Sequence, residues 1–112
     1  MIYKISDRAV WEESQRAGFF HGSPDDLRDG YIHFSTAGQL AGTLAKYHAG
    51  RAGLVLAAID PGRLGPELKW EPARGGDFFP HLHAPLAMAD VAWVSLIGLD
   101  PDGLHILPEG VI

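Results

Sequence analysis

The chain has 112 residues, which is enough for one hydrophobic core and too few for two. Its formal net charge is −5 and its basic side chains form no cluster, so a long nucleic acid is not an expected partner, whereas a small anion in a locally positive pocket is. No apolar run reaches the roughly 20 residues of a membrane span, no signal-peptide pattern is present, and cysteine is absent. We therefore expect a single cytoplasmic domain over residues 1–112, without a membrane partner.

The first part of the chain predicts a strand, a helix and a loop. Residues 1–5 have the pattern of a short strand, and the apolar residues that follow recur at helical spacing up to Gly18. Residues 19–30 contain Gly22, Pro24 and two consecutive aspartates. This composition indicates a surface loop with at most one turn of helix.

The run over residues 30–36 predicts a strand with one apolar and one polar face. Successive side chains of a strand point to opposite sides, so Ile32 and Phe34 can enter the core together. The side chains expected on the opposite face are Tyr31, His33 and Ser35. A polar face backed by buried residues suggests the wall of a cleft.

A helix is expected directly after this strand. Thr36 and Gln39 have the spacing of a capping box, an apolar stripe continues to Tyr47, and Gly50 suits the end of a helix. The strand therefore leads into a helix start, where free N–H groups and the positive end of the helix dipole favour an anion near His33.

The second half of the chain predicts four further strands. Residues 54–59 form a continuous apolar run that is typical of a buried central strand. Residues 68–71 alternate, which places Glu71 on the polar side, and residues 91–97 and 104–107 flank an Asp-Pro-Asp-Gly turn. Strands and two main helices without regular alternation predict a small α+β domain.

The run from Phe79 to His83 allows two interpretations. In an extended segment, His81 and His83 share a face and two imidazoles can bind a metal. The candidates for a third ligand are His33, Glu71 and Asp77. Because no established metal motif is present, we expect no metal; the alternative is a turn over residues 78–81 in which at least one phenylalanine plugs the core and Pro80 fixes the bend.

The remaining candidates for chemistry are a carboxylate and a serine. Glu71 follows a tryptophan, where a carboxylate can have a raised pKa or orient a hydroxyl group; the alternative is a solvated side chain or an ion pair with Lys69, Arg74 or another cation. Ser35 and His33 on one strand face are about 6–7 Å apart, which is too far for a direct proton relay. Nucleophilic catalysis is therefore not expected.

Four runs of the chain resemble a bacterial family of unknown function, domain of unknown function 952, over nearly the whole length. They are Ile2–Ser6 with Trp11, Gly30–Ser35 with Gln39 and Tyr47, Trp70–Pro72, and Phe79–Leu86. The resemblance implies an ADP-ribosyltransferase-like fold, with split mixed or antiparallel sheets around an NAD-type cleft. The middle run is also similar to the His-Val-His-Leu-Ser segment of RNA 2'-phosphotransferases.

This resemblance implies roles for eight residues. The catalytic residues would be His33, Glu71 and His81, and the cofactor-binding residues Tyr3, Lys4, Ser35, Tyr47 and His83. In this scheme His33 and Lys4 hold ribose or phosphate oxygens, and Glu71 stabilises the positive charge that develops at the ribose carbon. His81 then serves as the acid or base, with NAD as the cofactor.

Two alternatives to an ADP-ribosyl or 2'-phosphoryl transferase remain open. Tyr3 and Lys4 stand where the related enzymes have an aromatic residue and a histidine, and lysine lacks the acceptor of an imidazole; this favours a non-catalytic module that binds a nucleotide or ADP-ribose. The other is a metal-dependent enzyme that uses His33, His81 and His83.

Overall fold

The computed structural model describes residues 1–111, which form three α-helices, nine strands and four short 3-10 helices. The α-helices are α1 (Arg8–Ala17), α2 (Pro24–Asp29) and α3 (Leu40–Tyr47). The strands are β1 (Ile2–Asp7), β2 (Phe19–Phe20), β3 (Ile32–His33), β4 (Leu54–Ile59), β5 (Leu68–Pro72), β6 (Phe78–Leu82), β7 (Leu86–Ala87), β8 (Val91–Leu99) and β9 (His105–Ile106). The 3-10 helices are η1 (Ala37–Gln39), η2 (Pro61–Arg63), η3 (Arg74–Gly76) and η4 (Met88–Asp90).

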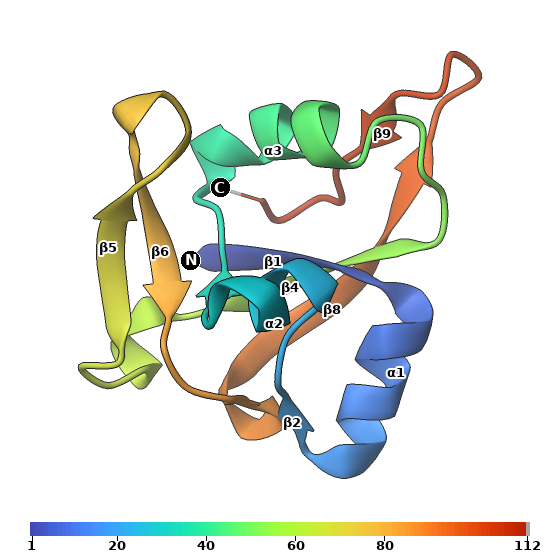
Figure 1. Ribbon diagram of the computed structural model, residues 1–112. Helices are drawn as coiled ribbons and strands as arrows, with labels where there is room; N and C mark the ends of the chain where they lie inside the picture. Colours follow the sequence, from blue (N-terminus) through green and yellow to red (C-terminus); the bar gives the residue numbers. More distant parts are fainter. Residues whose placement is uncertain (112) are drawn as a thin grey trace.

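The strands form two main antiparallel sheets that meet at one point. The larger sheet has the order β1-β4-β8-β9 and the smaller has the order β3-β6-β5, while β2 and β7 pair separately (Figure 1). Tyr3 of β1 and Ser35, just after β3, exchange backbone hydrogen bonds of 2.8 and 2.9 Å. The mixture of helices and antiparallel sheets confirms the predicted α+β class.

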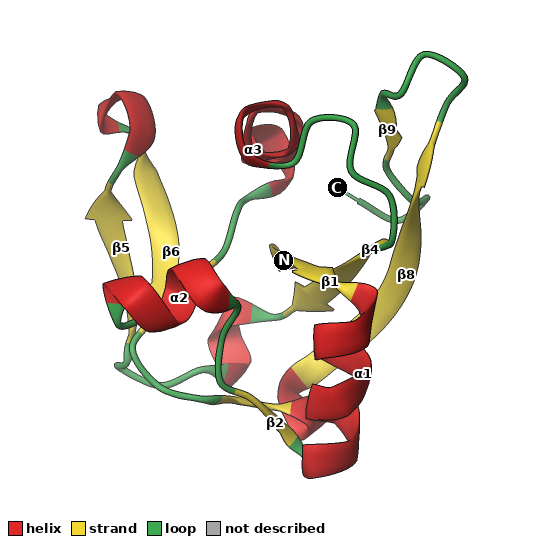
Figure 2. Ribbon diagram, turned by 45° about the vertical axis from the view of Figure 1, so that its right-hand side comes forward, coloured by secondary structure: helices red, strands yellow, loops and turns green. Residues whose placement is uncertain are grey.

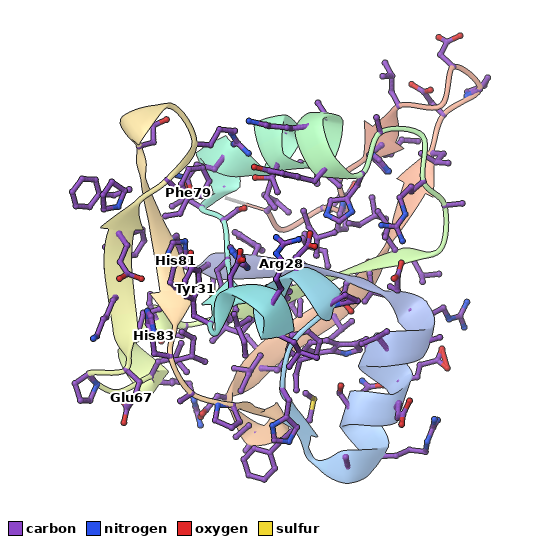
Figure 3. All side chains as sticks on the ribbon, in the orientation of Figure 1. Arg28, Tyr31, Glu67, Phe79, His81 and His83 are labelled. Atoms are coloured by element: carbon purple, nitrogen blue, oxygen red, sulfur yellow. The ribbon has the colours of Figure 1, made fainter. Side chains whose placement is uncertain are left out.

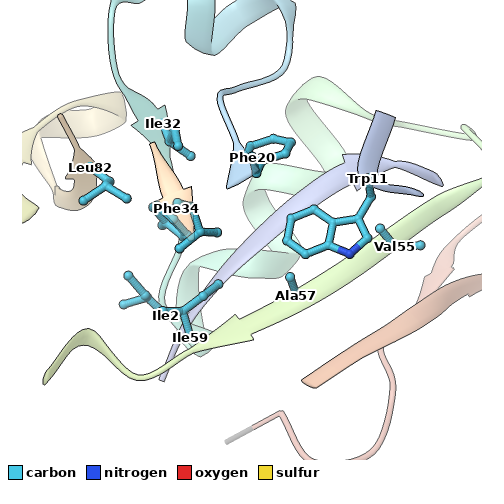
Figure 4. Packing of buried hydrophobic residues seen from close by; sticks show 10 residues of the cluster. Ile2, Trp11, Phe20, Ile32, Phe34, Val55, Ala57, Ile59 and Leu82 are labelled. Atoms are coloured by element: carbon cyan, nitrogen blue, oxygen red, sulfur yellow. The ribbon is translucent and has the colours of Figure 1, made fainter. Parts of the chain in front are cut away.

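The hydrophobic core lies on both faces of β1 and β4. One cluster, shown in Figure 4, contains Ile2, Trp11, Phe20, Ile32, Phe34, Val55, Ala57, Ile59, Leu82 and Leu86. The other contains Tyr3, Ile5, Leu40, Leu44, Leu54, Leu56, Ala58 and Ile97. Alternate residues of β4 therefore face α1 and the smaller sheet on one side and α3 on the other (Figure 2). The run over residues 54–59 is the buried spine that its sequence predicted.

Helix α2 lies within the segment that was expected to be mainly a loop. Ser23 caps it, Pro24 occupies the first turn, Asp26 completes the capping box, and Gly30 ends it with φ 85°. The Ser-Pro-Asp-Asp sequence is a helix start, but the helix that it opens has only six residues, so apolar periodicity gave no signal. None of the helices within residues 1–111 is long and apolar enough to cross a membrane.

The predicted turn at Phe78–His81 is wrong, because these residues belong to strand β6. Proline is tolerated in this central strand because its missing N–H faces the segment just beyond the end of β3. On the same side, the Pro80 carbonyl accepts a hydrogen bond of 3.0 Å from the Phe34 N–H. Phe79 is 6% exposed and Phe78 is 59% exposed, so one of the two phenylalanines plugs the core, as expected.

Candidate functional site

A cleft of about 440 Å³ lies between α2, α3, β1 and the β5–β6 hairpin. The predicted site residues that line it are Tyr3, Lys4, His33, Ser35, Tyr47 and His81. The other two, Glu71 and His83, are not part of its lining. Six residues from four separate elements therefore converge on one cavity, and the remaining two lie next to it.

Asp26 is the centre of a buried polar network at one end of this cleft. Its carboxylate accepts hydrogen bonds from Lys4 Nζ (2.8 and 3.0 Å), from the N–H of Ser23 (2.9 Å), and from the N–H and Nδ1 of His33 (3.1 and 2.6 Å). Burial alone would raise the pKa of Asp26, but the donors and the charge of Lys4 outweigh it and hold the pKa well below its usual range. Asp26 is therefore ionised at neutral pH at the wall of the cleft.

Lys4 is committed to this network. Its side chain is 6% exposed, and its ammonium also donates to the carbonyl oxygen of His33 at 3.1 Å. Burial lowers the pKa of Lys4, while the charge of Asp26 offsets part of the effect. A ligand that uses Lys4, as the resemblance implies, would have to share its ammonium with Asp26, so this role stays a prediction.

Both ring nitrogens of His33 face carboxylates. Nδ1 lies 2.6 Å from Asp26 Oδ1, and Nε2 lies 3.0 Å from Asp29 Oδ2. Only the doubly protonated ring can donate to both oxygens. Both carboxylates belong to α2, so this helix holds the ring. The two carboxylates therefore fix the orientation of the ring at the wall of the cleft.

His81 is more deeply buried than His33, and only one carboxylate contacts its ring. It is 3% exposed, and its Nδ1 lies 2.9 Å from Glu71 Oε1. Burial lowers the pKa of His81, so the ring is neutral near pH 7; donation from Nδ1 to Glu71 then leaves Nε2 as an acceptor. The expected pairing of Glu71 with Lys69 or Arg74 is wrong: Glu71 contacts His81 and His83, the latter at 2.8 Å, because β5 and β6 bring them together.

Tyr31 joins the three histidines into one aromatic cluster. Its ring centroid lies 4.2 Å from that of His81, 4.7 Å from that of His33 and 5.0 Å from that of His83. The rings of His33 and His81 are 5.4 Å apart and nearly perpendicular. Figure 3 shows Tyr31 beside His81 and His83 at the edge of β6.

Among residues 1–111, no three His, Cys, Asp or Glu side chains are arranged to hold a metal ion, so the metal-dependent hypothesis has no ligand set.

The opposite wall of the cleft comes from α3 and the β5–β6 turn. Ser35 Oγ lies 3.0 Å from Thr43 Oγ1, which itself donates to the carbonyl of Gln39 at 3.1 Å. Since the one hydroxyl proton of Thr43 goes to Gln39, Ser35 is the donor to Thr43. Arg74 reaches the same hydroxyl at 3.4 Å and lies near the ring of Tyr47.

Sequence reasoning did not assign a site role to Asp26, Thr43 or Arg74. The signal for Asp26 is its position three residues after Ser23, which is the spacing of a capping box. Arg74 carries the weaker signal of a lone cation in a glycine-rich turn, and nothing in the local sequence distinguishes Thr43.

These features define an α+β domain with two sheets bridged at one point and a histidine-containing cleft between them. The model of the family described as "Protein of unknown function (DUF952)" matches residues 5–94, so the chain belongs to this family. It is similar to the crystal structure of protein CC0527 from Caulobacter crescentus, with 46% identity and a TM-score of 0.90 over 94% of this chain and 92% of that chain. The solution NMR structure of CC0527 gives 47% identity and a TM-score of 0.83 over 92% and 89% of the two chains. Comparison with curated proteins finds no match.

Proposed function

We propose that the cleft binds a phosphorylated nucleotide of the NAD or ADP-ribose type. The observation that carries this proposal is convergence: positions that the ADP-ribosyltransferase resemblance marks on β1, on β3 and the residues just after it, on α3 and on β6 line a single cavity. Its volume of about 440 Å³ falls within the range of small-molecule sites, roughly 300–1,000 Å³. The split arrangement of the two sheets agrees with the fold that the resemblance implies.

The chemistry of the lining fits such a ligand. The rings of Tyr47 and Phe79 offer apolar surface for a base or ribose, and the hydroxyl groups of Ser35 and Thr43 and the cationic groups of the cleft offer polar contacts. Nucleotide sites combine mostly apolar walls with a few oriented polar groups in the same way.

Calorimetric titration with NAD, ADP-ribose and AMP tests this proposal. We expect saturable binding of at least one of them. Tyr47→Ala should weaken binding by about tenfold, because its ring is 53% exposed, lines the cleft, and can be removed without opening the core. Phe78→Ala is the matched control, since that ring is exposed but lies outside the lining. A wild-type protein that binds none of the three compounds contradicts the proposal.

The second candidate is transfer of an ADP-ribosyl group, and the position of His81, whose Nδ1 faces Glu71 while the ring lines the cleft, favours it. A neutral His81 can take the proton from an attacking hydroxyl as its oxygen bonds the ribose carbon, while the bond to nicotinamide breaks and neutral nicotinamide leaves. The Nε2 of His33 can hold a ribose or phosphate oxygen in place of Asp29, whose side chain is 32% exposed. Glu71 then acts through His81, which it orients.

Release of nicotinamide from NAD distinguishes the two candidates. With water, an alcohol or a 2'-phosphorylated oligonucleotide as acceptor, the wild type should form product, and His81→Asn should lower the rate by about 100-fold or more. His21→Asn should retain the rate, because His21 is exposed and lies outside the cleft lining. Saturable binding without nicotinamide release rejects the transferase and retains the nucleotide-binding function.

A further inference from the structure

Arg74 differs from the other lysine and arginine side chains of the cleft. Within the described residues, the other three each form an ion pair with aspartate: Lys4 with Asp26, Arg28 with Asp25 and Asp29, and Arg51 with Asp7. Across residues 1–111, no Asp or Glu side chain forms an ion pair with Arg74. Its charge is therefore not neutralised by a carboxylate.

Aromatic rings and a hydroxyl group hold Arg74 at the cleft. Its guanidinium carbon lies 4.9 Å from the ring centroid of Phe79 and 5.9 Å from that of Tyr47, and Nη1 donates to Thr43 Oγ1 at 3.4 Å. Contact with ring faces orients a guanidinium without cancelling its charge. A guanidinium has five N–H donors in a fixed fork, and this one long bond occupies a single donor.

Helix α3 leaves space for this guanidinium at Gly42. A Cβ atom at position 42 would lie 3.2 Å from Arg74 Nη2, which is closer than an ordinary van der Waals contact. Glycine in a helix interior is destabilising relative to alanine, and the backbone at Gly42 does not have the positive φ that would require glycine. Helix α3 thus has a weak helix former, Gly42, at the position next to the guanidinium of Arg74.

We propose that Arg74 is the phosphate-binding residue of the cleft and that Gly42 preserves the space it needs. The inference rests on the proposed nucleotide-binding function and narrows its ligand to compounds with a phosphate or diphosphate group. The planar fork of Arg74 takes two phosphate oxygens at once, while Thr43 and the two rings fix its position. A nucleoside without phosphate lacks the group that Arg74 recognises, so it binds much more weakly.

Calorimetric titration of the full chain with ADP-ribose, adenosine and inorganic pyrophosphate tests this role. Arg74→Gln should weaken ADP-ribose binding by about 10- to 100-fold and leave the weak binding of adenosine unchanged. Arg74→Lys should fall in between, because lysine keeps the charge and loses the fork. Thermal melting of each variant checks that the domain remains folded.

Gly42→Ala gives an independent test with a matched control. The added methyl group should displace the guanidinium and weaken ADP-ribose binding several-fold, on the order of 3- to 10-fold, while the better helix former raises the melting temperature. Gly38→Ala should leave the affinity unchanged, because a Cβ there meets no atom within 4 Å. Affinity lost together with stability would indicate simple damage to the helix and would count against the proposal.

The outcomes separate this inference from the function on which it rests. If Arg74→Gln binds ADP-ribose like the wild type while Tyr47→Ala loses affinity, the role of Arg74 is overturned and nucleotide binding stands. If the wild type binds no nucleotide, the proposed function fails, and pyrophosphate decides the role of Arg74: binding that Arg74→Gln abolishes supports a phosphate site, and an absence of binding, or binding that survives Arg74→Gln, overturns it.

Discussion

Two carboxylate–histidine pairs lie next to Tyr31, and they differ in what surrounds the carboxylate. Asp26 has a side chain that is 1% exposed, and it accepts hydrogen bonds from Lys4, His33 and a backbone N–H. Glu71 is 37% exposed and contacts two imidazoles. Both pairs hold a histidine next to the same tyrosine ring, yet one carboxylate is buried with a lysine and the other is partly open to water.

This difference gives the two carboxylates different roles: Asp26 stabilises the fold, and Glu71 sets the proton affinity of His81. A buried anion with a buried cation cannot lose its partner without leaving an uncompensated charge in the interior. A partly exposed carboxylate is solvated when its partner is removed, so its main effect is on the proton affinity of the histidine it touches. We therefore expect changes at Asp26 to affect folding and changes at Glu71 to affect His81.

The largest effect is expected for Asp26→Asn. The substitution keeps the shape of the side chain but leaves the ammonium of Lys4 buried without its counter-ion, which costs about 3–5 kcal/mol of unfolding free energy. Urea denaturation measures the loss. Asp25→Asn is the matched control, because Asp25 is an exposed neighbour on the same helix and its removal should leave stability nearly unchanged. A loss below about 1 kcal/mol for Asp26→Asn would contradict the structural role.

The acid dependence of stability is the next effect in size. The pKa of Asp26 is lowered by folding, so the folded state binds fewer protons than the unfolded state, whose aspartate has a pKa of about 3.9. The contribution of Asp26 is therefore fully present above about pH 4 and is lost as pH falls toward its folded pKa. Denaturation at a series of pH values should show a steeper acid loss for the wild type than for Asp26→Asn; equal slopes would exclude Asp26 as the source.

Part of the fold and of the site could be predicted from the sequence. The strand over residues 54–59 and the helix ending at Tyr47 could be predicted, because apolar periodicity reports burial directly. The face shared by His33 and Ser35 was predictable for the same reason, and both residues line the cleft. Each of these predictions depends on neighbours in the sequence.

The partners of the histidines could not be predicted in the same way. Lys4 and Asp26 are 22 residues apart, and their contact depends on how α2 packs over β1. Glu71 meets His81 because the register of β5 and β6 pairs His81 with Lys69, which makes Glu71 its diagonal neighbour. Register and helix docking are set by the whole core, so the candidate residues were visible in the sequence but their pairing was not.

Glu71→Gln should change the proton affinity of His81 with little effect on folding. The hydrogen bond and the charge of Glu71 raise the pKa of His81 against the larger effect of burial. Removing that charge should therefore lower the pKa of His81 further below its usual value. NMR titration of the His81 Hε1 resonance measures this shift; an unchanged or raised pKa would mean that Glu71 does not orient His81 as a proton acceptor.

The smallest effect is expected for His83→Asn, and its sign is opposite to that of Glu71→Gln. The charge of His83 lowers the pKa of His81 and is the weakest of the influences on it, so its removal should move the pKa of His81 slightly upward. The same substitution frees Glu71 from its 2.8 Å contact with His83, which strengthens the remaining hydrogen bond to His81 and acts in the same direction. Opposite shifts of the His81 pKa in Glu71→Gln and His83→Asn would establish that Glu71 sets the proton affinity of His81. General damage to the β5–β6 hairpin would instead move both titrations the same way.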